Sequence, residues 1–327
     1  MKCTNKYIGI ALIISSLLLS GCGKEKEDYS TFDPYVTTYR YGITSLADDS
    51  SLGGKFFAQD ILVNGVEDIG TSAVNSQLSQ AGIVINTNTN TITYAKNIHT
   101  QIFPASTTKI LTCLIACEKG NLDEVYTVSA NAVKQASDSA TIKLKAGDQI
   151  TLRDLLYGMM LVSGNDAAVA IAEGIAGSVD EFANMMNERA LSVGATNSHF
   201  ANPNGLHDEN HYTTTYDMYL ILNEALKNPT FYTLFAATNY ECTYTSNGQT
   251  TTGKWESTNQ FIAGKQKFAN GFTIIGGKTG TTGAAGYCLV LLSMNENHDS
   301  VISMVYNADS RNSLYTFTNE ILTNYGN

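Results

Sequence analysis

The pattern of hydrophobic and polar positions predicts β-strands near both ends of the chain and helices in its middle. Residues 83–85 (IVI) and 91–94 (TITY) flank an Asn- and Thr-rich turn, which is typical of a β-hairpin. Later β-rich runs and a closing helix are expected at residues 272–275, 287–293, 301–306 and 310–324. Between residues 106 and 227 the apolar positions recur mainly with helical spacing. This order predicts an α+β fold, in which an antiparallel sheet backed by terminal helices lies beside an all-α lobe.

One predicted helix is apolar on nearly all sides, and it runs from just after Pro104 to Gly120. Such a helix is expected to be buried. Ser106 lies at its N-terminal end, where free N–H groups and the helix dipole favour negative charge, and Lys109 follows on the same face. Burial would lower the pKa of Lys109 and make a neutral amine available as a base. For this segment alone, a capping serine followed by an exposed lysine is an equally good interpretation.

A second polar segment, Ser163–Asn165 (SGN), separates two apolar stretches that are expected to be helical. The Ser163 hydroxyl is suited to relaying a proton, and the Asn165 carboxamide to bonding both a lysine and a substrate. A plain turn with Asp166 as the helix cap is the alternative interpretation.

A third segment, residues 276–283 (GGKTGTTG), follows the strand expected at 272–275. Its glycines would let a peptide approach the backbone closely and pair with the strand edge. Lys278 would hold an anion or tune the serine, and the Thr279 and Thr281 hydroxyls would bind a carboxylate. A Gly-rich hairpin turn is the alternative here.

Taken together in this order, the three segments supply a nucleophile, two amines, a bridging hydroxyl and a carboxamide. These are the groups that serine acyl transfer needs in the absence of a histidine base. The segments resemble the S-x-x-K, S-x-N and K-T-G motifs of D-alanyl-D-alanine carboxypeptidases, the low-molecular-mass penicillin-binding proteins. The resemblance covers about residues 75 to 325 and is carried by residues 104–109 (PASTTK), 163–167 (SGNDA), 200–206 (FANPNGL) and 277–280 (GKTG).

The resemblance implies a β-lactamase/transpeptidase-like fold with its active site in the groove between the two lobes. It further implies hydrolysis of the terminal D-alanine from peptidoglycan stem pentapeptides through an acyl-enzyme on Ser106, with no cofactor or metal. Lys109 would be the general base, and Ser163 and Asn165 would complete the proton network. The residues implied to bind substrate are Lys278, Thr279, Gly280 and Thr281. The backbone N–H groups of Ser106 and Thr281 would form the oxyanion hole.

The same resemblance makes β-lactams the expected covalent inhibitors. A Glu-x-x-Leu-Asn segment of the kind that supplies the deacylating glutamate of class A β-lactamases is missing from the sequence, which favours slow turnover of these drugs. Three alternatives stay open: a D,D-endopeptidase, a β-lactamase-like hydrolase and a non-catalytic penicilloyl-binding sensor. A sensor would be expected to have lost Lys109, Asn165 or Lys278, and the chain keeps all three.

The N-terminus resembles a bacterial lipoprotein signal. Lys2 and Lys6 precede an apolar run over residues 8–19 that is short for a membrane span, and Leu19–Cys22 (LSGC) is similar to a lipobox. This implies a signal peptide over 1–21, lipidation of Cys22, a flexible stalk over 22–56 and a catalytic domain over 57–327. The protein would then be anchored by lipid at the extracytoplasmic face of the bacterial membrane. An ordinary signal peptide with an incidental cysteine is the alternative.

The net charge of the protein limits the classes of partner that it is expected to bind. Removal of residues 1–21 takes away two of the 20 Lys and Arg and none of the 30 Asp and Glu, which leaves a net charge of −12. So acidic a protein is not expected to bind nucleic acid or to adsorb electrostatically to anionic lipid.

Two histidines and four cysteines could in principle form a metal site or disulfides. His207 and His211 lie four apart around two acidic residues, but the preceding turn favours a solvated loop over a metal site. Cys113 and Cys117 are expected to be small core residues, and a disulfide between Cys242 and Cys288 stays open.

Overall fold

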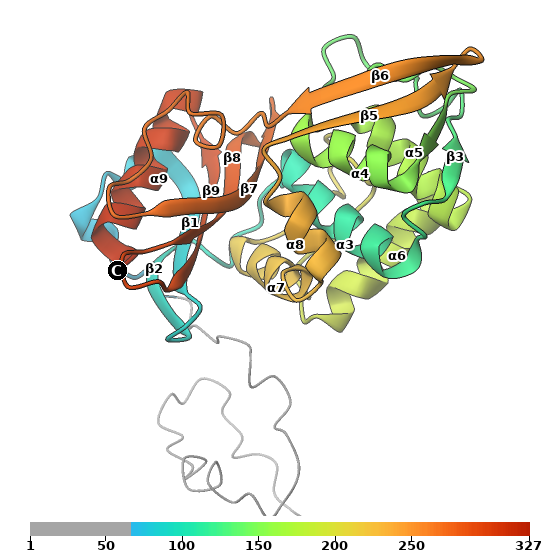
Figure 1. The fold of residues 1–327 in the computed structure, drawn as a ribbon. Helices are drawn as coiled ribbons and strands as arrows, with labels where there is room; N and C mark the ends of the chain where they lie inside the picture. Colours follow the sequence, from blue (N-terminus) through green and yellow to red (C-terminus); the bar gives the residue numbers. More distant parts are fainter. Residues whose placement is uncertain (1–66) are drawn as a thin grey trace, which may run out of the picture. The chain divides into compact units, whose positions relative to one another are not determined.

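A five-stranded antiparallel sheet forms one lobe of the structure, a computed structural model in which residues 67–327 are described. Its strand order is β2-β1-β9-β8-β7, so strands from near both ends of the described residues share one sheet (Figure 1). The strands are β1 (Ser79–Asn86), β2 (Thr91–Lys96), β7 (Thr273–Thr282), β8 (Gly286–Met294) and β9 (Ser300–Ala308). The predicted N-terminal hairpin and the late strands are confirmed. The predicted signal peptide (1–21), the lipidation residue Cys22 and the stalk (22–56) lie outside the described residues.

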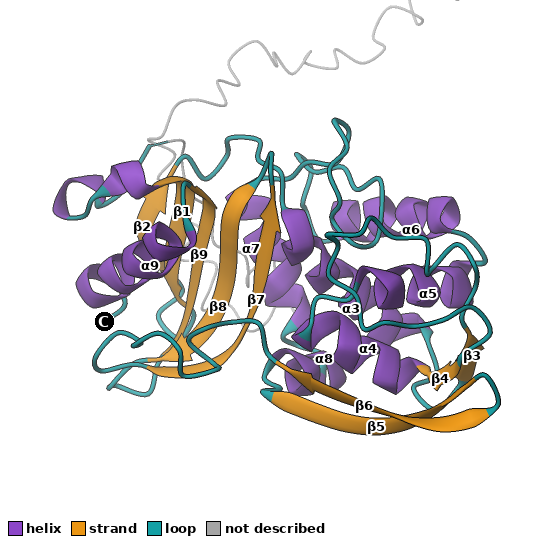
Figure 2. Cartoon of the chain, turned by 90° about the horizontal axis from the view of Figure 1, so that it is seen from above, coloured by secondary structure: helices purple, strands orange, loops and turns teal. Residues whose placement is uncertain are grey.

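One face of this sheet is covered by the C-terminal helix α9 (Arg311–Tyr325), as Figure 2 shows. The Ser310 hydroxyl caps the helix by accepting a hydrogen bond from the N–H of Ser313. Apolar side chains of α9 pack with buried residues of the strands in a small second core. The described residues before β1 form two short 3₁₀ turns, Thr71–Ala73 and Ser76–Leu78. The closing helix is therefore present, but no α-helix backs the sheet from residues 67–78.

The second lobe is built around α3 (Lys109–Lys119), which contacts every other helix of this lobe. All residues of α3 from Lys109 to Ala116 are buried, as its all-round apolar sequence predicts. The surrounding helices are α4 (Leu152–Leu161), α5 (Asn165–Ala176), α6 (Val179–Ser192), α7 (Thr215–Ala225) and α8 (Pro229–Phe235). Side-chain oxygens of Thr151, Ser178, Thr214 and Asn228 cap four of these helices.

This lobe is not all-α, contrary to the sequence prediction. It carries a four-stranded sheet with the order β3-β4-β5-β6, formed by β3 (Val125–Thr127), β4 (Gln149–Thr151), β5 (Asn239–Ser246) and β6 (Gln249–Glu256). The β5–β6 hairpin turns at Asn247 and Gly248, both with positive φ (50° and 72°). An Asn-Gly pair between Thr-rich strands is a strong hairpin signal, so the sequence did carry this information.

A 3₁₀ turn, Ala105–Thr108, joins the two lobes by packing against β7 and β8. Ser106 therefore lies in this turn, and the α-helix begins only at Lys109. The chain bends there because Ala105 has a left-handed backbone, with φ at 48°. On the facing side, Lys278–Gly280 lie inside strand β7 rather than in a Gly-rich turn, so that alternative interpretation is wrong. Within residues 67–327, no helix has both the length and the apolar character needed to cross a membrane.

Candidate active site

Ser106 and Lys109 lie side by side where the two lobes meet. The Lys109 Nζ atom is 3.0 Å from the Ser106 Oγ atom, and the lysine side chain is fully buried. This proximity follows from the turn geometry, because residues three apart on a helical turn share one face. The predicted nucleophile and base are therefore brought together.

The Lys109 amine has two further partners, both of them amide oxygens. Asn165 Oδ1 accepts a hydrogen bond at 2.7 Å, and the backbone carbonyl of Asn204 accepts one at 2.5 Å. A neutral amine has two N–H bonds and one lone pair. Because an amide oxygen can only accept, the neutral form of Lys109 would use its two N–H bonds on Asn165 and Asn204 and keep its lone pair towards Ser106.

Burial lowers the pKa of Lys109 well below its ordinary value, and the nearby charge of Lys278 lowers it further. Asp166 acts in the opposite direction, but its carboxylate is already bonded by the backbone N–H groups of Ile142, Leu144 and Ala167. Burial and the neighbouring charge thus favour the neutral form of Lys109, while Asp166 supports the neighbouring loop.

Ser163 and Lys278 form a second pair across the groove. Lys278 Nζ donates to Ser163 Oγ at 3.0 Å and to the Thr279 carbonyl at 2.9 Å. Burial lowers the pKa of Lys278 to about 7. Ser163 has a left-handed backbone, with φ at 66°, which is costly for a residue other than glycine. The structure thus pairs Asn165 with Lys109 and Ser163 with Lys278.

Strand β7 lies along the nucleophile with its outer edge at the end of the sheet order. A Cβ atom on Gly280 would lie 2.9 Å from the backbone nitrogen of Ser106, so glycine permits this close approach. The unpaired strand edge is suited to binding an extended peptide. An oxyanion hole built from the N–H groups of Ser106 and Thr281 stays a prediction.

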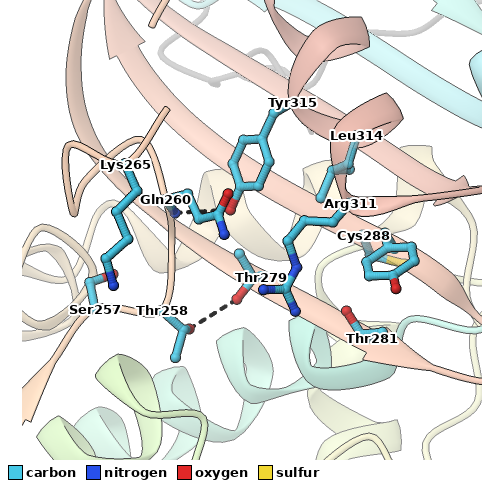
Figure 3. Close-up of a pocket in the computed structure, with 11 residues that line it drawn as sticks. Ser257, Thr258, Gln260, Lys265, Thr279, Thr281, Cys288, Arg311, Leu314 and Tyr315 are labelled. Carbon is cyan, nitrogen blue, oxygen red and sulfur yellow. Dashed lines mark hydrogen bonds between the residues drawn. The ribbon is translucent and has the colours of Figure 1, made fainter. Parts of the chain in front are cut away.

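A cavity of about 290 Å³ opens beside this edge, lined by Thr279, Thr281 and Arg311 among others (Figure 3). Thr279 and Thr281, which the motif predicted as carboxylate ligands, both border it. The sequence gives no sign of Arg311, because a single arginine at a helix start carries no motif. Arg153 and Arg189 bond carboxylates, whereas within residues 67–327 no acidic side chain pairs with Arg311. Its guanidinium is available to an anionic ligand.

The loop that carries His207 and His211 is only partly exposed to solvent, whereas the sequence predicted a solvated loop. His207 is exposed, but His211 is buried, with only 2% of its surface accessible. Burial became possible because both ring nitrogens of His211 have hydrogen-bond partners, Thr108 and the N–H of Ala201. In residues 67–327, no three His, Cys, Asp or Glu side chains are grouped to hold a metal ion.

The cysteines of the described residues are free thiols. Cys113 is buried and Cys117 half-buried, in agreement with their expected packing role. Cys242 and Cys288 are each buried on strands of different sheets and do not form the disulfide that the sequence left open.

Comparison with known proteins agrees with this geometry. Residues 70–310 match the family described as D-alanyl-D-alanine carboxypeptidase. The chain is 34% identical over 238 residues to the D-alanyl-D-alanine carboxypeptidase DacF of Bacillus subtilis, an alignment that covers 71% of this chain and 58% of DacF. It is 33% identical over 221 residues to the D-alanyl-D-alanine carboxypeptidase of Streptomyces sp. K15, covering 64% of this chain and 74% of that protein.

Solved structures show the same fold. The crystal structure of the Streptomyces K15 DD-transpeptidase matches with a TM-score of 0.69 at 31% identity, over 76% of this chain and 97% of that one. The α+β, transpeptidase-like fold predicted from the motifs is confirmed. The chain spans less than two thirds of the length of the first curated relatives, 58% and 62%.

Proposed function

Because the chain belongs to the D-alanyl-D-alanine carboxypeptidase family, we propose that it is a serine hydrolase acting on peptidoglycan stem pentapeptides. It removes the terminal D-alanine through an acyl-enzyme on Ser106. The observation that carries this proposal is the Lys109 amine, held 3.0 Å from the Ser106 hydroxyl by two amide oxygens.

In the acylation step, Lys109 takes the Ser106 proton as Oγ attacks the carbonyl carbon of the penultimate D-alanine. The N–H groups of Ser106 and Thr281 stabilise the oxyanion. The peptide C–N bond then breaks, and the leaving amine of the terminal D-alanine receives the proton. The Ser163 hydroxyl, held by Lys278, is the group that relays it. Thr279, Thr281 and Arg311 bind the carboxylate of the leaving residue.

In the deacylation step, water attacks the ester carbon and Lys109 accepts the water proton. That proton returns to Ser106 Oγ as the ester bond breaks. Asp166 is not suited to this role because its oxygens already accept three backbone hydrogen bonds. A β-lactam opens on the same serine, and its amine stays tethered to the acyl group, so the adduct is expected to persist.

The protein is further proposed to be anchored by a lipid on Cys22 at the extracytoplasmic membrane face. The lipobox-like segment Leu19–Cys22 after an apolar run supports this. A single acyl chain binds membranes only weakly, whereas a diacylglycerol anchor supplies two chains. Expression of Cys22→Ala in a bacterial host tests the anchor, because the variant should leave the membrane fraction. An unchanged distribution would refute it.

The catalytic proposal is tested by incubating the purified protein with a pentapeptide muropeptide and, separately, with a crosslinked dimer. Release of free D-alanine from the first substrate alone identifies a carboxypeptidase. Cleavage of the dimer identifies an endopeptidase, and rapid turnover of a chromogenic cephalosporin a β-lactamase. Ser106→Ala should lose covalent labelling by fluorescent penicillin while unfolding at the same temperature. Labelling that persists in this variant would place the nucleophile elsewhere.

A further inference from the structure

His211 lies outside the three motifs, yet its side chain is buried against the turn that carries the nucleophile. Only 2% of its surface is accessible, and its ring packs edge-on against Phe200 with centroids 5.5 Å apart. A buried imidazole with defined polar partners is a candidate for a role beyond packing.

The hydrogen bonds of His211 fix its tautomer. The backbone N–H of Ala201 donates to Nδ1 at 3.1 Å, so Nδ1 carries no proton. The ring proton therefore lies on Nε2, which donates to Thr108 Oγ1 at 2.8 Å. Thr108 is the last residue of the turn that holds Ser106, and it directly precedes Lys109. His211 is thus bonded to the residue that directly precedes the base Lys109.

The loop between Ala201 and His211 also touches the base. The Pro203 carbonyl accepts a hydrogen bond from Thr112 Oγ1 at 2.7 Å, and the Asn204 carbonyl accepts one from Lys109 Nζ. Gly205 packs so tightly that a Cβ atom there would lie 1.8 Å from the Ala105 carbonyl oxygen. The loop therefore rests directly on the 3₁₀ turn, and its position decides where the Asn204 carbonyl lies.

We propose that His211 is a positioning residue for acyl transfer. By donating from Nε2 to Thr108, it holds the loop against the turn, so that the Asn204 carbonyl takes one N–H of the Lys109 amine. The amine lone pair then stays directed at Ser106. This inference rests on the proposed function, because the reaction that it assists is acylation of Ser106.

Charge in the surroundings of His211 favours the neutral ring that this arrangement needs. Burial is the main cause that lowers its pKa to about 4, and His199 and His207 contribute in the same direction. Asp208 is the one acidic group that opposes them. Protonation would place a hydrogen on Nδ1, facing the N–H of Ala201. The contact should therefore persist from about pH 5 to pH 8.

The test measures acylation by fluorescent penicillin in the purified full chain, with the noncovalent Kd and the acylation rate constant determined separately. Thr108→Val removes the acceptor at nearly constant volume, and Thr108→Ser restores it. We expect the acylation rate constant to fall roughly 10- to 100-fold in Thr108→Val and His211→Ala, with Kd changed less than about twofold. Thr108→Ser should recover most of the rate. The matched control is His207→Gln on the exposed part of the same loop, which should behave as wild type.

The possible outcomes distinguish a failure of the proposed function from a failure of the positioning role of His211. If the wild-type protein forms no adduct at Ser106, the proposed function fails. If it forms the adduct and Thr108→Val acylates at the wild-type rate, only the positioning role of His211 fails. A parallel loss of affinity in Thr108→Val and Thr108→Ser would also refute it, because that pattern indicates general damage to the groove. Should His211→Ala not fold, the two Thr108 variants still decide.

Discussion

Lys278 donates a hydrogen bond from Nζ to the Ser163 hydroxyl at 3.0 Å, which connects the edge of the five-stranded sheet to the helical lobe. The two residues lie 115 positions apart in the sequence. Because burial brings the pKa of Lys278 to about 7, this amine can carry or release a proton near neutrality. The pair thus places a titratable amine beside the hydroxyl that the motif predicts as the proton relay.

Burial of Lys278 should cost stability in a pH-dependent way. Its pKa is about 7 in the folded protein and 10.5 ordinarily, so between these values the unfolded chain binds more protons. Stability contributed by this site therefore rises as pH increases from 7 to 10.5, and the penalty is complete below pH 7. The shift in the pKa of Lys278 corresponds to a penalty of about 5 kcal/mol at most in the free energy of unfolding. Replacing Lys278 would remove this penalty, but it would also remove the hydrogen bonds of the amine, which costs about 1–3 kcal/mol.

Lys278→Met should accordingly be more stable than wild type at pH 7, lose this advantage by pH 10 and lose acylation throughout. Urea unfolding at pH 7 and pH 10 checks it. Lys145→Met, at an exposed lysine, is the matched control and should show no such trend. A Lys278→Met variant less stable at pH 7 than at pH 10, relative to wild type, contradicts the argument.

Asn165→Asp should impair Lys109 as a base while keeping a side chain of nearly the same shape. A carboxylate 2.7 Å from the Lys109 amine would stabilise its charged form and raise the pKa of Lys109. Acylation at pH 7 should fall by roughly 10²-fold and recover as pH rises, since deprotonation restores the lone pair. Stopped-flow labelling with fluorescent penicillin between pH 6 and pH 10 measures this. A loss of the same size at every pH would show that the amide acts on substrate rather than on Lys109.

Gly205→Ala should damage both folding and acylation. Gly205 has φ at 81°, and an added Cβ would lie 1.8 Å from the Ala105 carbonyl. Gly177→Ala is a matched control, because φ there is 82° and the added Cβ would meet no atom within 4 Å. The control should cost about 1 kcal/mol from backbone strain alone. We expect Gly205→Ala to cost at least 2 kcal/mol more by thermal unfolding and to slow acylation. Equal costs for the two variants would mean that the contact between loop and turn is loose.

Arg311→Gln should reduce discrimination for a free C-terminal carboxylate. The cavity places Arg311 with Thr279 and Thr281, and its charge is not used by an acidic side chain in residues 67–327. The ratio of kcat/KM for a pentapeptide and its C-terminal amide should fall by roughly 10- to 100-fold, the worth of one charge-assisted hydrogen bond. An unchanged ratio would assign the carboxylate to the two threonines alone. Arg153→Gln, at a surface ion pair, is the control.

Side-chain chemistry could be predicted from the sequence more fully than backbone chemistry. The spacing of the motifs predicts the roles of Ser106, Lys109 and Asn165 because their side chains carry the chemistry. The structure brings these three side chains into contact as expected. The Asn204 contact is made by a backbone carbonyl, which any residue type would supply, so no pattern could reveal it.

The errors in the fold prediction have similar causes. The helix predicted to begin just after Pro104 begins at Lys109, because helical spacing does not separate a 3₁₀ turn from the first turn of an α-helix. The β5–β6 hairpin was overlooked although Asn247 and Gly248 mark its turn, because its strands are rich in Thr rather than apolar. His211 was assigned to solvent since sequence gives no sign of the partners that satisfy both its ring nitrogens.

Ala105 precedes the nucleophile and Ser163 bonds Lys278, and both residues hold left-handed backbones where glycine would adopt the same angles at lower energy. A glycine would also loosen the backbone at each position and leave the neighbouring catalytic groups less firmly held. Directed evolution for thermostability alone is therefore expected to admit glycine at these two positions and to yield sturdier but slower enzymes. A search for thermostable variants should therefore measure the reaction rate together with the melting temperature.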